Sequence, residues 1–392
     1  MQNLKVKQIL EIINDEYIKQ KEKETKVNHQ VSKMTWIIMF KLLLMSLLSP
    51  ENTTLRALEA IYSSDKFNEF ANKEKTKTRH STIRDRISTM NRNFFKEIFE
   101  DLSEKYSKYL NEKITKNQII IKKFDSTLVW LSEELLKFWI KAWSPKDRHV
   151  KFTIWLEWYL PSKVKIYTTQ EASSEDVALW ETILEETSKK NQIIVFDRWV
   201  QKRETYWKLI DKEIDFVSRL RNNVKYEKIR TYKEIKWRKV WELKLESDEM
   251  VKLYTRKWKK LEKEVRVIIA YKWTERYIFV TNILGLSARR ITEIYARRWD
   301  IEVFFRFIKQ EFWFSHFVSR SENWIMNMLY MTLIVSILII VYREKNNIVW
   351  YKEAKRMFIS ELNELLLIDL ALAIWWDISI LKEKYLYYYC DD

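Results

Sequence analysis

Glycine is nearly absent from this chain, and its absence constrains the fold more than any other feature of the sequence. Among 392 residues there is one glycine, Gly285, beside 19 tryptophans. Glycine makes up about 7% of an ordinary protein, and it adopts the positive φ angles of tight turns at low cost because it has no Cβ atom. A chain of this length must therefore make its turns with residues that suit them poorly.

Several tryptophans stand where a turn or a close approach of backbone is expected. These are Trp143, Trp158, Trp199, Trp273, Trp375 and Trp376. A bulky side chain disfavours a positive φ angle. We therefore hypothesise that the gene uses a code in which UGA means glycine, and that the sequence reads those codons as tryptophan. The alternative is a tryptophan-rich binding surface, which predicts a stripe of tryptophans and not a set of turns.

Charge and composition restrict the partner and the compartment. The formal net charge of +16 attracts polyanions, so nucleic acid is the first candidate partner, and a merely soluble basic surface is the alternative. One cysteine, Cys390, excludes an internal disulfide framework, and four scattered histidines do not suggest a zinc site. The amino terminus lacks a secretory apolar segment. We expect a cytoplasmic protein.

One apolar stretch is almost long enough to span a membrane. Residues 325–341 are apolar except for polar positions such as Asn327, and Arg343 and Lys345 follow them. We interpret this stretch as a buried helix and expect no membrane contact. A membrane protein remains the alternative for this segment.

The apolar pattern changes along the chain from helical to strand-like. Residues 1–115 have helical periodicity, and Arg84, Arg86 and Arg92 project from one basic helix that suits contact with DNA; a purely structural helical domain is the alternative. From residue 118 the runs QIIIKKFDSTLV, VKFTIWLEWYL and SKVKIYTT predict three consecutive strands. A helix over 175–189, the strand QIIVFD, a helix over 202–212 and the strand IDFVSRL follow. This order predicts an α/β core.

Two aspartates end or interrupt apolar strand-like runs. Asp125 precedes Ser-Thr after one such run, and Asp197 closes another. Carboxylates at the ends of strands face a sheet edge, where ligands and metals bind in open α/β folds. Asp147 and Asp176 are weaker candidates for the first acid because no apolar strand precedes them.

A third carboxylate lies in the segment YARRWDIEVFFRFIK. Tyr295, Arg298, Glu302 and Lys309 are spaced three, four and seven residues apart. At about 100° per residue, they fall within roughly 40° of Glu302 on one helix face. An apolar stripe beside them would dock the helix on a core. The alternative is an amphipathic helix with solvated ion pairs.

This segment resembles the signature helix of the DDE transposases of bacterial insertion sequences, in the branch marked by Tyr, Arg, Glu and Lys at these intervals. The stretch RRWDIEVFFRFIKQEF is similar over its whole length. In that family one Asp lies on the first strand, a second on the fourth strand within Asp-Arg-Gly, and a Glu on a later helix. Asp125, Asp197 and Glu302 match these positions. The expected glycine is Trp199, whereas Trp299 is the one tryptophan that the resemblance expects to be genuine.

The resemblance implies a fold and domain boundaries. It implies an RNase H-like mixed-sheet catalytic core with a β-rich insertion, plus an N-terminal helical domain. From Asp197 to Glu302 the chain runs for 105 residues, too many for one helix and its loops, so an insertion is expected there. We place a DNA-binding helical domain at 1–115, the first part of the core at 116–222, the insertion at 223–285, the second part of the core at 286–345 and a C-terminal helical region at 346–392. An unrelated binding domain is the alternative for the insertion.

The resemblance also implies the chemistry. Asp125, Asp197 and Glu302 would be catalytic residues that hold two Mg²⁺ ions, with Mn²⁺ as a substitute, and water would cleave the end of the element to free a 3′-OH for strand transfer. Double-stranded DNA, as terminal inverted repeats and target, is the implied partner of a homodimer in a synaptic complex. The residues expected to bind nucleic acid are Tyr295, Arg298, Lys309, Arg198 and Arg219.

The resulting interpretation is a DNA transposase that acts by cut-and-paste transposition. Two other functions stay open. One is an RNase H-like, metal-dependent nuclease without strand transfer, and the other is a non-enzymatic DNA-binding protein derived from a transposase. Plain salt-bridge roles remain the alternative for Tyr295, Arg298 and Lys309.

Overall fold

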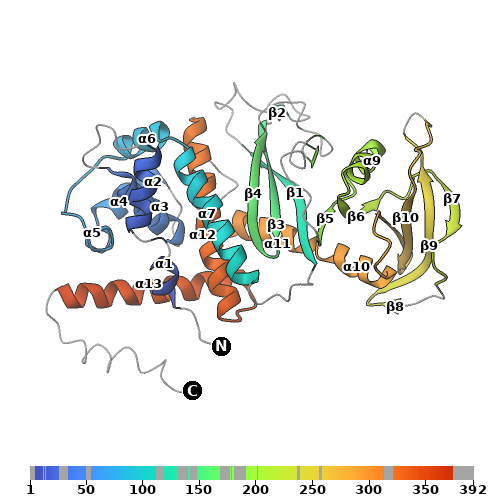
Figure 1. Ribbon diagram of the computed structural model, residues 1–392. Coiled ribbons are helices and arrows are strands. Elements are labelled where there is room, and N and C mark those ends of the chain that lie inside the picture. Colours follow the sequence, from blue (N-terminus) through green and yellow to red (C-terminus); the bar gives the residue numbers. More distant parts are fainter. Residues whose placement is uncertain are drawn as a thin grey trace, which may run out of the picture. The chain divides into compact units, whose positions relative to one another are not determined.

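The structure of the protein is a computed structural model in which the chain forms two compact units (Figure 1). Unit 1 comprises Met1–Tyr106 and Phe307–Asp392, and unit 2 comprises Ser107–Arg306. The structure describes residues 5–11, 13, 15–25, 34–49, 54–111, 119–130, 140–141, 148–167, 177, 179–180, 191–200, 202–235, 239–255, 258–312 and 321–373. The domain boundaries expected from the sequence stay a prediction.

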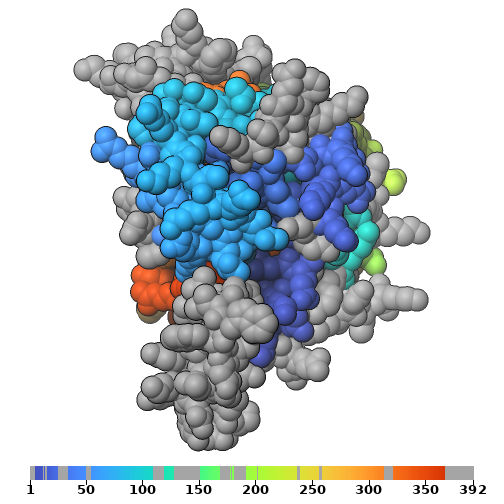
Figure 2. Space-filling view, turned by 90° about the vertical axis from the view of Figure 1, so that its left-hand side faces the viewer, coloured from blue at the N-terminus to red at the C-terminus, as the bar shows by residue number. Residues whose placement is uncertain are grey.

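Unit 1 is helical in the residues that the structure describes. Its helices are α1 (Val6–Glu11), α2 (Asp15–Thr25), α3 (Trp36–Leu48), α4 (Leu55–Ser63), α5 (Asp65–Ala71), α6 (His80–Thr89), most of α7 (Asn93–Asn111), α12 (Glu322–Lys345) and α13 (Tyr351–Ala373). The N-terminal helices, in blue, form much of the coloured surface in Figure 2. Side-chain caps begin three of these helices: Thr54 accepts a bond from the Ala57 amide, Ser64 one from the Phe67 amide, and Ser321 one from the Trp324 amide.

Helix α12 is the long apolar helix expected from the sequence. Among the described helices it alone is long and apolar enough to cross a membrane, yet 94% of its most apolar window is buried inside the protein. Asn327, fully buried, donates hydrogen bonds to the carbonyls of Ile87 and Met90 at 3.0 and 3.4 Å. Its apolar surface is therefore covered by the protein, as in the core helix of a bundle.

The basic helix of this unit, α6, differs from the expectation in two respects, and the first is that α6 ends at Thr89, so Arg92 lies after it. Arg84 is exposed, and Arg92 forms an ion pair with Glu322 at 3.0 Å. Arg86 does not project: it is half-buried and donates a hydrogen bond to the Met34 carbonyl. Its long side chain packs inside the unit, as arginine stems commonly do, so only part of the predicted basic face is open.

Unit 2 contains the predicted α/β core. Its elements are β1 (Ile120–Trp130), β2 (Ile140–Lys141), β3 (Arg148–Glu157), β4 (Leu160–Tyr167), β5 (Gln192–Phe196), α9 (Arg203–Asp211) and β6 (Asp215–Leu220). The order β4-β3-β1-β5-β6, with β3 antiparallel to β1 and β4 and with β5 parallel to β1 and β6, is that of an RNase H-like core. The helix expected over 175–189 lies mostly outside the described residues.

Five further strands follow β6 and extend the same sheet. They are β7 (Tyr226–Thr231), β8 (Lys239–Val240), β9 (Leu243–Leu253), β10 (Val265–Lys272) and β11 (Glu275–Thr281). Strand β11 pairs antiparallel with β6, with Ile278 opposite Leu220. The residues between Asp197 and Glu302 are thus built onto the edge of the core sheet and not onto a separate sheet.

Helices pack on both faces of the sheet. Because side chains alternate along a strand, Phe124, Phe196 and Phe216 lie on one face with α9. Val195 and Val217 lie on the other face, with α10 (Ala288–Ala296), which is followed by α11 (Trp299–Glu311) (Figure 1). Odd-numbered residues of β1 near Asp125 share the face that α10 covers.

Four tryptophans have the left-handed backbone that favours glycine. Their φ angles are 56° at Trp158, 53° at Trp241, 61° at Trp258 and 55° at Trp273. Three of them begin a two-residue hairpin connection, between β3 and β4, β8 and β9, and β10 and β11. A positive φ at the first position of such a loop is the geometry for which type II′ turns use glycine.

This backbone is what the recoding hypothesis predicts at those positions. Trp199 is different, because its φ angle is not positive although its side chain is 55% exposed. Trp143, Trp375 and Trp376 lie outside the described residues. The codons themselves decide the hypothesis: UGG at most of these positions would contradict it.

We predict that Trp273→Gly stabilises the protein. The Trp273 side chain is 89% exposed, so little packing is lost, and the left-handed backbone costs a residue with a Cβ atom about 1–2 kcal/mol. The free energy of unfolding, measured with urea, should rise by about 1 kcal/mol. Trp350→Gly is the matched control, because Trp350 is 70% exposed without a positive φ. An equal gain in both variants would contradict the turn argument.

Candidate active site

The first two acids lie side by side because β1 and β5 are parallel neighbours. Phe124 pairs with Phe196 in this ladder, so the next residue on each strand is an aspartate, Asp125 or Asp197. Asp197 directly follows β5, as expected. Asp125 does not end its strand, because β1 continues to Trp130 along β3; β5 stops beside it, which leaves this side of β1 open. The side chains are 23% and 21% exposed.

The segment of the third acid is not the single helix that the spacing predicts. Helix α10 ends at Ala296 and α11 begins at Trp299. At the junction, Arg297 and Arg298 donate backbone hydrogen bonds three residues back, to Ile294 and Tyr295, in place of the four of an α-helix. Tyr295 therefore lies on α10, Arg298 in the junction, and Glu302 on the first turn of α11. No Pro or Gly marks this break in the sequence.

The guanidinium of Arg298 contacts all three acids. Its Nη1 lies 3.7 Å from Asp125 Oδ2, its Nε lies 3.9 Å from Asp197 Oδ1, and its Nη2 bonds Glu302 Oε1. The Arg298 side chain is only 13% exposed. The structure thus brings Asp125, Asp197 and Glu302 together around the buried guanidinium of Arg298.

Tyr295 completes this cluster. Its hydroxyl donates to Asp197 Oδ1 at 3.4 Å, and its ring makes an edge contact with Phe279. Burial raises the pKa of the Tyr295 hydroxyl. The charge of Arg298 lowers this pKa in part and that of Asp197 raises it, so the net shift is upward. Tyr295 therefore stays protonated and acts as a hydrogen-bond donor.

The acids keep Arg298 charged. Burial by itself would lower the pKa of this guanidinium, but Tyr295, Asp197 and Glu302 raise it, and the net shift is upward. Arg298 is thus a permanent positive charge among three carboxylates.

The carboxylates suit a hard divalent cation by their chemistry. Mg²⁺ prefers carboxylate oxygens, and three such groups from β1, the end of β5 and α11 surround one position. Among the described residues, no group of three His, Cys, Asp or Glu side chains is arranged to hold a metal in this structure. Arg298 lies where their charges converge, so the acids can hold cations once this side chain moves.

The other predicted DNA-binding residues are placed differently. Arg198, next to Asp197, is exposed. Arg219 is not: it forms an ion pair with Glu275 at 2.8 Å and lies over the Tyr277 ring, so its charge is used within the sheet. Lys309 is half-buried on the part of α11 that belongs to unit 1. Asp147 and Asp176 lie outside the described residues.

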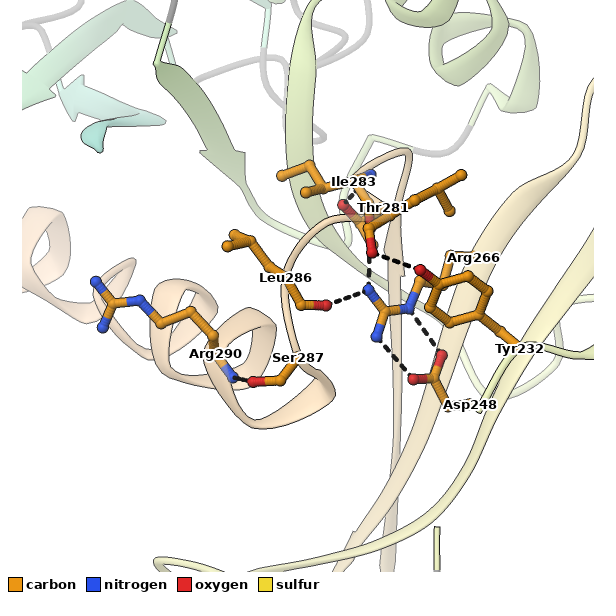
Figure 3. A network of polar contacts seen from close by, with 9 residues as sticks. Tyr232, Asp248, Arg266, Thr281, Ile283, Leu286, Ser287 and Arg290 are labelled. Atoms are coloured by element: carbon orange, nitrogen blue, oxygen red, sulfur yellow. Dashed lines mark hydrogen bonds and ion pairs between the residues drawn. The ribbon is translucent and has the colours of Figure 1, made fainter. Parts of the chain in front are cut away.

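A fully buried ion pair anchors the start of α10, and sequence reasoning missed it (Figure 3). Arg266 on β10 bonds both carboxylate oxygens of Asp248 on β9 at 2.8 and 2.7 Å. It also donates to the carbonyls of Ile283 and Leu286 at 3.0 and 2.6 Å. The next residue, Ser287, caps α10, so the insertion fixes the helix that carries Tyr295.

A second missed pair joins β1 to α11. Lys123 Nζ lies 2.9 Å from Asp300 Oδ2, and the Lys123 side chain is 3% exposed. A lysine two residues before the first aspartate, and an aspartate two residues before the glutamate, were the available signals.

Comparisons with known proteins find transposases. A family model described as Transposase DDE domain matches residues 162–338. A probable transposase for insertion sequence element IS5377 from Geobacillus stearothermophilus is 26% identical over 156 residues, 40% of each chain. A putative transposase for insertion sequence element IS4SA from Synechocystis sp. is 27% identical over 256 residues, 63% of this chain and 66% of that protein. The chain thus matches less than two thirds of the length of either relative.

The match to the Transposase DDE domain and the two relatives support a DDE transposase of insertion sequences. A solved structure, a piggyBac transposase synaptic complex with hairpin DNA, has a TM-score of 0.43 and 11% identity over 84% of this chain and 72% of that chain. A likeness at that level adds nothing to the assignment.

We predict that Arg298→Ala destabilises the metal-free protein. Its loss leaves three partly buried carboxylates to repel one another, which should lower the free energy of unfolding by about 2 kcal/mol, less than the roughly 3–5 kcal/mol for a fully buried pair. Added Mg²⁺ should raise the melting temperature of Arg298→Ala more than that of the wild type. Arg289→Ala, which removes an exposed pair with Glu293, is the control and should change little. Equal behaviour of both variants would contradict the counter-charge role.

Proposed function

We propose that the protein is a DNA transposase that cleaves the ends of its own element and joins them to target DNA by cut-and-paste transposition. The observation that carries the proposal is the convergence of Asp125, Asp197 and Glu302 on one guanidinium at the open side of β1. Carboxylates gathered from distant parts of a chain repel one another unless a positive charge compensates them, and such clusters are typical of sites that bind cations.

Asp125, Asp197 and Glu302 would hold two Mg²⁺ ions, which Mn²⁺ replaces. Bound there, the ions supply a lowered pKa for the attacking water and stabilise the leaving oxygen. The three carboxylates have fixed positions on β1, after β5 and on α11, and these positions would orient the bound ions. No covalent protein intermediate is required.

Arg298 has two tasks in this proposal. Without metal ions, its guanidinium neutralises the three acids. When the carboxylates bind metal ions instead, the guanidinium becomes available to bind a phosphate near the scissile bond. Tyr295 donates its hydroxyl proton in a hydrogen bond beside Asp197, and Lys309 binds the DNA backbone further along the helix. Arg198, exposed beside Asp197, is the better of the two weaker candidates, because Arg219 is committed to Glu275.

Double-stranded DNA is the proposed partner, as terminal inverted repeats and as target. The net charge of +16 supports a polyanionic partner. Cutting two ends together requires a synapse, so we propose a homodimer. The protein would act in the cytoplasm, where it meets DNA.

We predict that Asp125→Asn, Asp197→Asn and Glu302→Gln each abolish Mg²⁺-dependent nicking of the element's ends, because each removes a cation-binding charge. The assay uses labelled DNA from the flanks of the open reading frame, with a gel-shift measurement of end binding. We expect nicking to fall at least about 1,000-fold while binding stays within about threefold of wild type.

Asp211→Asn is the matched control for these variants. Asp211 is an aspartate in an exposed ion pair with Lys263, away from the acid cluster, and its loss should leave nicking unchanged. Full activity in any one of the three acid variants would remove that residue from the site. Absence of nicking in the wild type would favour the non-enzymatic DNA-binding protein.

Strand transfer separates the transposase from a simple nuclease. We predict that a precleaved end with a free 3′-OH, supplied with Mg²⁺ and a supercoiled plasmid, gives a covalently joined product with the wild type and none with Glu302→Gln. The measurement is a gel of labelled end in plasmid-sized DNA. Nicking without any joined product would favour the RNase H-like nuclease.

A further inference from the structure

A buried ion pair connects the two elements that carry Asp125 and Glu302. Lys123 lies two residues before Asp125, so both side chains share one face of β1. Asp300 lies two residues before Glu302, in the first turn of α11. Lys123 Nζ is 2.9 Å from Asp300 Oδ2, with side chains 3% and 22% exposed. The pair therefore joins strand to helix at positions two residues from Asp125 and from Glu302.

A second contact supports the same junction. Lys123 also donates to the carbonyl of Trp158, in the turn between β3 and β4. The next residue of that turn, Tyr159, lies under the Lys123 ammonium at 5.2 Å and accepts a hydrogen bond from Arg297 at 3.1 Å. Arg297 is in the break between α10 and α11. The turn, the strand and the start of α11 are thus held by one polar cluster.

Stability alone does not account for a buried lysine at this place. A buried ion pair gains about as much as its desolvation costs, whereas it does fix the relative position of the groups that it joins. The neighbouring Lys122 points to the other face of β1 and meets Glu157 on the adjacent strand at 4.0 Å. Of the two lysines, only Lys123 reaches the helix.

We propose that the Lys123–Asp300 pair is a positioning device that sets the separation of Asp125 from Glu302 and thereby the affinity of the site for divalent cations. The proposal rests on the proposed function, because it gives the three acids a cation to hold. Neither residue touches the cation or the DNA. Both act through the carboxylates two residues further along each element.

The experiment measures Mn²⁺ binding to the full-length protein without DNA, by electron paramagnetic resonance of free Mn²⁺. Lys123→Met, Asp300→Asn and the double variant are compared with the wild type, and thermal unfolding is recorded for each. Lys122→Met is the matched control, because it removes a buried lysine from the same strand but from the other face. Loss of an outer contact that orients metal ligands typically costs about 10–100-fold in metal affinity.

We expect the Kd for Mn²⁺ to rise about tenfold or more in both single variants, and to stay within about twofold of wild type in Lys122→Met. The double variant carries no unpaired buried charge, so it should regain melting temperature relative to the single variants and yet bind Mn²⁺ no better. Recovery of Mn²⁺ affinity together with melting temperature would overturn the proposal, because the pair would then be merely structural.

Asp125→Asn separates this proposal from the proposed function. If the wild type binds Mn²⁺, Asp125→Asn does not, and Lys123→Met binds like the wild type, then the positioning role alone is overturned. If Asp125→Asn binds Mn²⁺ like the wild type, the metal site itself is wrong and both proposals fall.

Discussion

The contact of one buried guanidinium with three carboxylates is the interaction on which the site depends. Asp125, Asp197 and Glu302 repel one another, and few folds would gather them without a compensating charge. Arg298 supplies that charge from the junction of α10 and α11, within 4 Å of an oxygen of each acid. Three carboxylates neutralised in this way can lie close together without a bound metal ion.

The sheet makes this gathering possible. Parallel pairing of β1 and β5 places two aspartates side by side with no further device. The five later strands extend the sheet through β11, and the buried Arg266–Asp248 pair ties them to the loop before α10 (Figure 3). The insertion thus braces the helix that carries Tyr295. The Lys123–Asp300 pair holds the other end of the same region, so α10 and α11 are fixed at both sides of their junction.

Patterns of residue type predicted the local elements well. Short runs of β-branched and aromatic residues located β1, β3, β4, β5 and β6, and the aspartates that follow apolar runs led to Asp125 and Asp197, although β1 continues past Asp125. The same reasoning failed where long-range contacts decide. It placed Tyr295 and Lys309 on one helix, although i→i−3 bonds break that helix at Arg298. It also left Arg86 projecting, although Arg86 bonds Met34, 52 residues away.

The sequence by itself determined the order of strands and helices and the excess of positive charge, since these depend on local periodicity and on residue type, and it predicted the three acids that the structure brings together. It also indicated turns at tryptophan positions, and two of these in the described residues, Trp158 and Trp273, have a left-handed backbone. Only the tertiary structure decided which arginine and lysine side chains pair with which carboxylates. Pairs such as Arg298 with Asp125, or Lys123 with Asp300, join residues more than 170 positions apart, and their formation depends on burial and register that no local pattern contains.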